Sequence, residues 1–277
     1  MQIVIPERSS HWYTKGGQPF YEMPCLGNPG KMKSPTLADA KRMFLSGELV
    51  IVPSVTGITH SWGNPMLSAY AKEQGIRAAM KLLPDRQPEE TDDDFIRRAS
   101  EEGDRSRAEA ADLGTSVHKA MERFRITNEL EEYADPRMAP IMLGFKEWAE
   151  GHLGETIDAE KMFASKLGFG GRIDELAKGR ENIRILLDYK TQGGPSGRKM
   201  RAYPNHGWQL AAYAEGMGLD ESWYLWNVLI STTDAGRIEV RDWTKDRADC
   251  WQQFSAIFEA WCKVNHYDPR SNNNATD

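Results

Sequence analysis

Two aspartates and a lysine lie in two apolar segments whose pattern predicts a pair of β-strands. Asp174 lies in the first segment, and Asp188 and Lys190 lie in the second. The polar stretch 178–182 between them includes a glycine and predicts the turn of an antiparallel hairpin that begins at Gly170. This hairpin places Asp174 almost opposite Asp188, and Lys190 faces the same side because side chains alternate along a strand.

Two carboxylates and an ammonium group on one face suit the hydrolysis of a phosphodiester. Paired carboxylates bind a hard cation such as Mg²⁺, which polarises the phosphoryl oxygen and lowers the pKa of a bound water. A lysine beside them can position that water or stabilise charge in the transition state. Because Asp-x-Lys is common, ordinary surface charges on a strand pair are the alternative, and the choice depends on residues elsewhere.

Two helical segments carry further polar pairs at a spacing of four residues. His118 and Glu122 share one helical face, and both are metal-ligand types. Gln209 and Tyr213 share a face of a later helix, where an amide and a phenol can orient a lysine or contact a phosphate. The alternative is that both helices simply pack on the sheet.

A glycine-rich, basic loop follows the strand that carries Lys190. Within residues 161–210, ten Lys or Arg stand against four Asp or Glu, although the net charge of the chain is −6. An acidic protein can still present a basic groove, so we expect this loop to contact the backbone of DNA. The residues expected to contact DNA here are Thr191, Arg198, Lys199 and Arg201, with Tyr203 or Trp208 stacking on a base. An ordinary solvated loop is the alternative.

Composition excludes several classes of protein. With 277 residues and 40% hydrophobic content, the chain can bury one sizeable core or a core with a helical elaboration. No apolar run approaches a membrane span, and the first residues lack the pattern of a secretory signal, so we expect no membrane association. Three cysteines without CxxC spacing fit a reducing cytoplasm and argue against a disulfide framework, a zinc site or an iron–sulfur cluster.

The order of expected elements indicates an α/β core with a mixed sheet that a helical region precedes. A hairpin is expected near residues 11–21, and the acidic stretch 84–104 is expected to be a solvated connection. The expected helices are 36–47, 66–83, 105–125 with a loose point near Gly114, 136–150, 206–217 and 245–264. The expected strands are 49–52, 158–165, 171–177, 183–189, 224–231 and 237–243.

Four motifs in this order resemble the RecB-like branch of the PD-(D/E)XK nucleases. They are Gly-Thr-x-Val-His-x-x-x-Glu, Gly-x-x-Asp, Asp-Tyr-Lys-Thr and Gln-x-x-x-Tyr, and together they cover about residues 105–215. The resemblance implies a restriction-endonuclease-like core, with a mixed central sheet flanked by helices, over residues 105–267. Residues 1–104 would form an N-terminal hairpin and helical region, and 268–277 a disordered tail.

The resemblance also implies roles for individual residues. In that branch the helix histidine and both aspartates bind the metal, and the backbone carbonyl between Asp and Lys joins them. Carried over, the metal ligands are His118, Asp174, Asp188 and Tyr189, and Mg²⁺ or Mn²⁺ is the implied metal. The implied catalytic residues are Asp174, Asp188 and Lys190, together with Gln209 and Tyr213 of the last motif, and Glu122, whose role varies in the branch.

The segment Pro53-Ser54-Val55-Thr56 resembles the opening of phage-type members and of the mitochondrial genome-maintenance exonuclease. In those relatives the helical region before the nuclease core forms an arch or channel for single-stranded DNA. Ser54 and Thr56 are therefore expected to contact DNA. The following residues, 57–60, depart from the usual pattern.

These features predict a metal-dependent exonuclease that acts on DNA ends, with a preference for single strands, in phage or bacterial recombination, repair or DNA processing. The expected partners are single-stranded DNA or duplex ends and a recombination or single-strand-binding protein, in the cytoplasm of a bacterial or phage-infected cell. A structure-specific or restriction-type endonuclease is the first alternative. A nuclease-dead DNA-binding module is the second, and the intact Asp174, Asp188 and Lys190 disfavour it.

Overall fold

A five-stranded mixed sheet lies at the centre of the computed structural model, which describes residues 11–28, 30–62, 65–194, 196–197 and 199–271. The strand order is β11-β10-β9-β8-β5, with β9 and β10 parallel and the other neighbours antiparallel. This confirms the predicted α/β class with a mixed sheet. The strands are β5 (Leu153–Ala159), β8 (Glu175–Gly179), β9 (Arg184–Gln192), β10 (Trp223–Ser231) and β11 (Ile238–Asp242).

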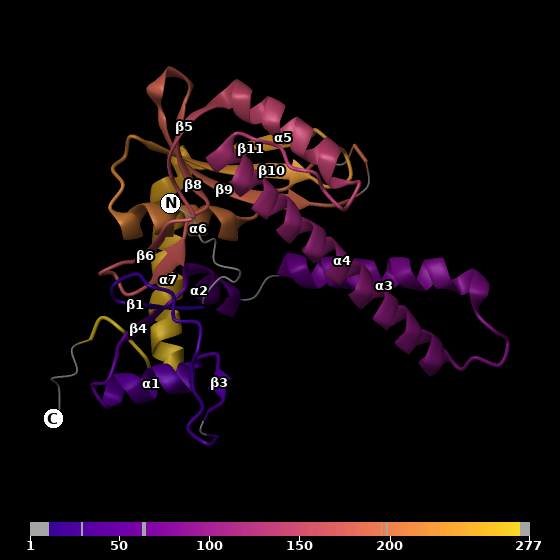
Figure 1. Cartoon of the computed structure of the whole chain (residues 1–277). Helices are drawn as coiled ribbons and strands as arrows, with labels where there is room; N and C mark the ends of the chain where they lie inside the picture. Colours follow the sequence, from indigo (N-terminus) through magenta and orange to yellow (C-terminus); the bar gives the residue numbers. More distant parts are fainter. Residues whose placement is uncertain (1–10, 29, 63–64, 195, 198, 272–277) are drawn as a thin grey trace.

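Helices cover both faces of this sheet (Figure 1). On one face α4 (Asp92–Thr127) and α5 (Met138–His152) pack on a core that includes Leu187 of β9. On the other face α6 (Pro204–Met217) and α7 (Arg247–Asn265) pack on a core that includes Leu186. Because successive side chains point to opposite faces, the apolar residues of β9 contribute to both cores. The same strand also carries polar residues.

The N-terminal residues form a small layer against the second core. Strand β1 (Trp12–Thr14) pairs with β4 (Ile51–Pro53), and β2 (Met23–Pro24) pairs with β3 (Met32–Lys33). The expected turn after β1 is present, but the main strand partner of β1 is β4. Helix α1 (Leu37–Leu45) begins at the predicted capping box, in which Thr36 and Asp39 satisfy each other's backbone N–H groups. The short α2 (Val55–Ser61), which the sequence analysis did not predict, follows β4.

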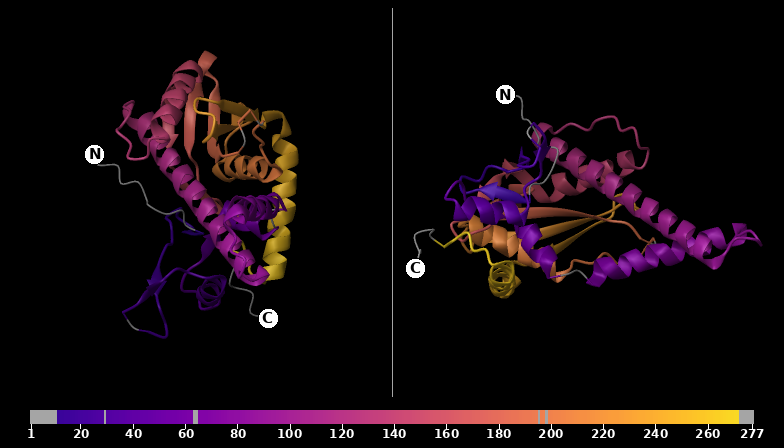
Figure 2. Two further views of the ribbon diagram at one scale, coloured as in Figure 1. Left: turned by 90° about the vertical axis from the view of Figure 1, so that its right-hand side faces the viewer. Right: turned by 90° about the horizontal axis from the view of Figure 1, so that it is seen from below.

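Helix α3 (Pro65–Leu82) and the first half of α4 form an antiparallel arm that projects from the core (Figures 1 and 2). The two helices approach closely where Gly103 meets Gly75, because a Cβ added at Gly103 would lie 3.2 Å from the Cα of Gly75. Gly103 therefore allows the two helices of the arm to pack closely at this point.

The expected acidic connection at 84–104 is wrong, because α4 begins at Asp92. The hydroxyl of Thr91 accepts a hydrogen bond from the backbone N–H of Asp94, and the acids of the first turn face the positive end of the helix dipole. The acidic run is thus the start of a helix of 36 residues. The domain boundary expected at residue 104 falls inside this helix.

The expected loose point near Gly114 is also wrong, since α4 runs through it without a break. A Cβ at this position would lie 2.7 Å from the Oγ1 of Thr191, at the end of β9. Gly114 therefore allows α4 to lie directly on the end of that strand.

Two expected strands are each divided in the structure. The segment 158–165 breaks at Glu160, which has a φ of 53°, so β5 is followed by a separate strand, β6 (Met162–Ala164). Strand β7 (Gly170–Arg172) pairs with β6, and after a break β8 pairs with β9 as the predicted antiparallel hairpin. In the observed register Glu175 is paired with Leu187. Asp174 precedes Glu175 and Asp188 follows Leu187, so the two aspartates lie opposite each other just beyond the last pair of the ladder.

Residues 268–271, the described part of the expected tail, form a turn that contacts α7. The guanidinium of Arg270 binds Asp268 and Glu259 and lies 5.0 Å from the ring centroid of Phe258 on α7. The remainder of the tail lies outside the described residues. Within the described ranges, no helix is long and apolar enough to cross a membrane.

Two glycines of α5 offer a test of how closely this helix packs on the turn between β10 and β11. A Cβ at Gly144 would lie 2.2 Å from the Cα of Gly236, whereas a Cβ at Gly151 would meet nothing within 4 Å. We expect Gly144→Ala to destabilise the protein by about 1–3 kcal/mol, because backbone must move. Gly151→Ala should be neutral or stabilising, by up to about 1 kcal/mol. Urea denaturation measures both; equal free energies of unfolding would contradict the close contact.

Candidate active site

The carboxylate of Asp188 lies at the centre of the predicted site, and the residue is only 1% exposed. Its Oδ1 accepts hydrogen bonds from the ammonium of Lys190 at 2.7 Å and from the amide of Gln209 at 3.0 Å. Its Oδ2 accepts one from the amide of Asn227 at 2.5 Å. A buried carboxylate needs such partners to offset its lost hydration.

Neighbouring elements position each of these partners. The parallel register of β9 and β10 sets Asn227 beside Asp188, and the indole N–H of Trp243 donates to the amide oxygen of Asn227 at 2.7 Å. The amide of Gln209 also contacts the hydroxyl of Tyr213, at 3.0 Å, one turn further along α6. Its Oε1 accepts from Lys190 at 3.3 Å. The amide of Gln209 thus links Lys190, Asp188 and Tyr213.

Asp174 faces α4 from the end of β8. Its Oδ2 lies 3.1 Å from the Nε2 of His118 and accepts a hydrogen bond of 2.7 Å from the backbone N–H of Tyr189. Tyr213 also packs here, because Gly171 has no side chain: a Cβ there would lie 2.5 Å from the Tyr213 ring. The structure therefore brings His118 and Asp174 into contact beside the hairpin.

The charges at this site shift one another's pKa values. Burial raises the pKa of Asp188 to about 6, against the lowering effect of Lys190. Burial would also raise the pKa of Asp174, but His118 and Lys190 hold it below its usual value. Conversely, burial would lower the pKa of Lys190 and of His118, but the aspartates beside them raise both. The site is a cluster of mutually dependent charges.

Two further carboxylates lie close to Asp174. Glu122, which the sequence analysis named, is buried, and its Oε1 has no hydrogen-bond partner among the described residues. Glu160, which it missed, pairs with Arg172 at 2.7 Å. Burial and the charge of Asp174 raise the pKa of Glu160 to about 8. Its position in a left-handed turn between two strands has no sequence signal, because it is neither glycine nor asparagine.

The opposite face of the hairpin carries a second polar network. Glu175, with 1% of its surface exposed, binds the guanidinium of Arg125 on α4, the hydroxyl of Tyr189 at 2.6 Å and the hydroxyl of Thr156 at 2.7 Å. The side chain of Tyr189 thus points away from Asp188. Alternation along the hairpin places Asp174 and Glu175 on opposite sides, which was a readable signal for this network.

A cleft with a cavity volume of about 710 Å³ opens beside these residues. His118 and Lys190 line it, and its walls come from α3, from α4 and from the chain that follows β9. Thr191 and Tyr203, both expected to contact DNA, line it as well. A neighbouring pocket includes Lys199, Arg201 and again Tyr203.

The structure does not bring three other expected DNA contacts to this cleft. Ser54 is buried and its hydroxyl caps α2 by accepting from the N–H of Gly57, so its expected contact with DNA stays a prediction. Thr56 lies in the first turn of α2 and contacts Ser54. Trp208 packs toward α7, where its indole N–H donates to Gln253 at 2.6 Å. The expected contact by Arg198 lies outside the described residues.

One cleft residue, His206, was expected only as the start of a helix. It is buried in the first turn of α6, and its Nδ1 accepts a long hydrogen bond, 3.4 Å, from the backbone N–H of Tyr203. Burial and the charge of Lys190 lower the pKa of His206 to about 3. A neutral imidazole therefore borders the cleft near the lysine. Its spacing of three residues from Gln209 places both on one helical face, which was a usable signal.

A family model described as the PD-(D/E)XK nuclease superfamily matches residues 93–254. This range runs from the first turn of α4 into α7 and includes the hairpin, both aspartates, the lysine and the helices that face them.

The chain belongs to the PD-(D/E)XK nuclease superfamily.

Members of this superfamily are typically metal-dependent nucleases that use Mg²⁺ or Mn²⁺, which supports nuclease activity and a DNA substrate for this member. No curated protein matches the chain. Among solved structures, one described as "Crystal structure of SSO0001" is 16% identical, covers 55% of this chain and 84% of its own, and has a TM-score of 0.22.

The donor types at the site of this PD-(D/E)XK protein fit a divalent cation. The imidazole of His118 and the carboxylate of Asp174 are already in contact, and the buried carboxylate of Asp188 lies on the neighbouring strand. Within the described ranges, however, no three His, Cys, Asp or Glu side chains are drawn together as one ligand set. Binding would therefore have to replace the direct contact between His118 and Asp174.

The pH dependence of metal binding follows from the raised pKa of His118. Below that pKa the imidazole is protonated, so a cation must displace a proton and its affinity falls, by up to about tenfold per pH unit. Above it the affinity should level off. We expect calorimetric Mn²⁺ titrations between pH 6 and 8 to show this rise, and His118→Asn to weaken binding and flatten it. His152→Asn, on the exposed surface of α5, is the control; a flat profile in the unmodified protein would contradict the assignment of His118.

The network around Glu175 should make a large contribution to stability. Arg125→Met leaves a buried carboxylate without its counter-charge, and we expect it to lower the free energy of unfolding by about 3–5 kcal/mol. Tyr189→Phe removes one hydrogen bond and should cost about 1–3 kcal/mol. Arg123→Met, on the same helix, breaks only an exposed pair with Glu131 and should cost less than about 1 kcal/mol. Urea denaturation measures all three, and equal effects of Arg125→Met and Arg123→Met would refute this role.

Proposed function

We propose that this protein is a metal-dependent DNA exonuclease of the RecB-like branch, acting on DNA ends with a preference for single strands. The observation that carries the proposal is the convergence of two pairs beside one cleft, His118 with Asp174 and Asp188 with Lys190. Such a protein would serve phage or bacterial recombination, repair or DNA processing.

In this proposal the imidazole of His118, the carboxylates of Asp174 and Asp188 and the carbonyl of Tyr189 hold the metal. When bound, Mg²⁺ or Mn²⁺ would polarise the phosphoryl oxygen and acidify the attacking water. Lys190 stabilises the negative charge that develops on the phosphate, because its raised pKa keeps it protonated. Gln209 orients Lys190, and Tyr213 holds the amide of Gln209 in place.

The walls of the cleft support the preference for single strands. The arm covers the cleft on one side, and Gly114 of α4 lies against Thr191 at the end of β9. A cavity of about 710 Å³ falls in the size range of sites for single small ligands, roughly 300–1,000 Å³, and suits one or two nucleotides better than paired strands. An endonuclease on the same core is the alternative, and it would need access to a continuous strand.

We expect replacement of the assigned residues to lower kcat by different amounts. Lys190→Ala should lower kcat about 100- to 1,000-fold, as loss of a charge-stabilising donor does. Gln209→Ala, which acts through Lys190, should lower it about 10- to 100-fold. Lys178→Ala is the control, because Lys178 lies on the same hairpin but pairs with Glu155 on the surface. Release of nucleotides from end-labelled single-stranded DNA with Mg²⁺ measures all three.

The substrate form separates the proposal from its alternative. Linear single strands should be degraded, whereas circular single strands and EDTA-treated reactions should show no products. If circular single strands were cleaved as fast as linear ones, the end-dependent proposal would be refuted in favour of an endonuclease. Full activity of the Lys190→Ala variant would refute the assigned active site.

A further inference from the structure

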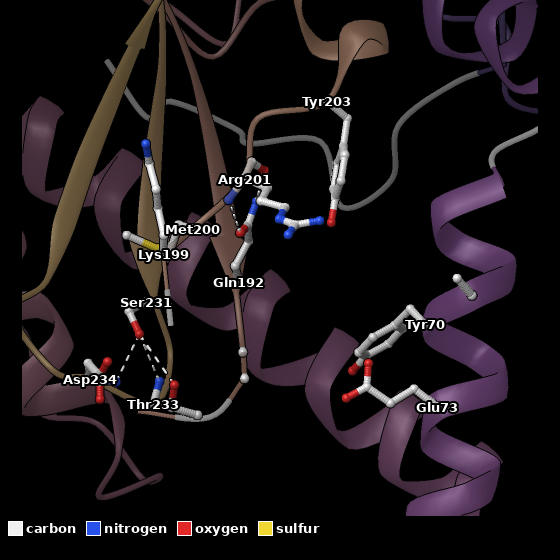
Figure 3. A pocket seen from close by; sticks show the side chains of 13 residues that line it. Tyr70, Glu73, Gln192, Lys199, Met200, Arg201, Tyr203, Ser231, Thr233 and Asp234 are labelled. Atoms are coloured by element: carbon white, nitrogen blue, oxygen red, sulfur yellow. Dashed lines mark hydrogen bonds between the residues drawn. The ribbon is translucent and has the colours of Figure 1, made fainter. Parts of the chain in front are cut away.

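A small pocket lies next to the cleft, between the arm and the loop after β9 (Figure 3). Its volume is about 190 Å³, and it shares Tyr70, Gln192, Gly193 and Tyr203 with the larger cleft. The two spaces therefore lie next to each other along a shared wall. A chain that passes the metal-ligand residues can enter this pocket without leaving the protein surface.

The wall on the core side is held in place by hydrogen bonds between side chains and the backbone of the loop. Gln192, at the end of β9, donates to the carbonyl of Arg201 at 2.5 Å and accepts from its N–H at 3.0 Å. The N–H of Gly197 donates to Asp234 at 2.9 Å. The loop is thus anchored to two strand ends, so Arg201 is presented from a fixed position.

The acidic groups around this pocket have hydrogen-bond or ion-pair partners, whereas its basic groups have no ion-pair partner within the described ranges. Asp234 binds Gly197 and Arg237, and Glu73 binds Arg77 on its own helix at 2.7 Å. By contrast, neither Lys199 nor Arg201 has an ion-pair partner within the described ranges. Figure 3 shows the guanidinium of Arg201 reaching toward the hydroxyl end of Tyr203, whereas Lys199 points away from both tyrosines. Arg201 is therefore the positive group available to a ligand at this wall.

Two aromatic rings border the same space from opposite elements. Tyr70 lies on α3 of the arm, remains 37% exposed and faces the pocket (Figure 3). Tyr203 lies on the core side, where the ring of His206 packs edge-on against it at 5.4 Å. An accessible ring together with an unpaired cation is the combination that binds a base and its phosphate in single-stranded nucleic acid.

We propose that this pocket binds one nucleotide of the DNA strand adjacent to the scissile phosphodiester, with its base stacked on Tyr70 and its phosphate at Arg201. The proposal rests on the proposed nuclease function and adds a nucleotide subsite that the arm and the core form together. Tyr203 forms the border between this subsite and the cleft. Stacking does not read sequence, so the subsite would accept any base.

The test measures binding rather than cleavage. The dissociation constant of a short fluorescent single-stranded oligonucleotide is measured by anisotropy in Lys190→Ala protein with EDTA, so that residual cleavage is suppressed and the DNA stays intact. We expect Tyr70→Ala to weaken binding about fivefold to a hundredfold and Tyr70→Phe to preserve it. Arg201→Ala should reduce the slope of affinity against salt by about 0.7, the contribution of one phosphate, and Arg201→Lys should restore it.

An abasic scan of the oligonucleotide locates the stacked base. Removal of the base at one position should weaken binding as much as Tyr70→Ala does, and the two changes together should cost no more than either alone. Arg97→Ala is the control, since Arg97 lies near the far end of the arm and pairs with Asp94. Unchanged binding by Tyr70→Ala, additive losses, or an equal loss in Arg97→Ala would overturn the subsite.

These outcomes are independent of those that test the proposed function. If unmodified protein degrades DNA but Tyr70→Ala binds and cleaves normally, the subsite alone fails. If Tyr70→Ala weakens binding at one base position but unmodified protein cleaves no DNA with Mg²⁺ or Mn²⁺, the subsite stands and the exonuclease proposal fails.

Discussion

The burial of one ionisable carboxylate in the central strand organises much of this structure. Asp188 loses its hydration inside the sheet, a cost of several kcal/mol for an ionised group without partners. Its partners come from its own strand, from the neighbouring parallel strand and from α6, and Trp243 and Tyr213 hold two of them in turn. The raised pKa of Asp188 shows that these partners offset the cost only in part. A cation bound beside Asp188 would offset more of this cost.

The second buried acid, Glu175, has a mechanical role on the other face of the same hairpin. Arg125 and Glu175 attach the C-terminal part of α4 to β8, and Gly114 lets the middle of that helix touch Thr191. His118 lies between these two attachment points. Its contact with Asp174 therefore follows from how the helix is fixed on the sheet, and not from the histidine alone.

The sequence was sufficient to predict the features that depend on local spacing. Alternation gave the antiparallel hairpin and placed Asp174 toward Asp188, and the capping box gave the start of α1. Features that depend on tertiary contact were missed. Asn227 becomes a partner of Asp188 only through the parallel pairing of β9 with β10, and Glu160 joins the acidic group only through a turn in a left-handed conformation. Likewise, the acids after Thr91 resembled a linker because their stabilising partner is the dipole of the helix that they begin.

The unbroken course of α4 has a consequence for how the molecule can move. At about 1.5 Å per residue, its 36 residues span roughly 54 Å and carry both the arm and His118 on one rod. No proline lies within it to act as a hinge. A displacement of the arm is therefore passed along the helix toward His118 and is not taken up at a proline hinge. The placement of the arm and the placement of His118 are therefore coupled through one continuous helix.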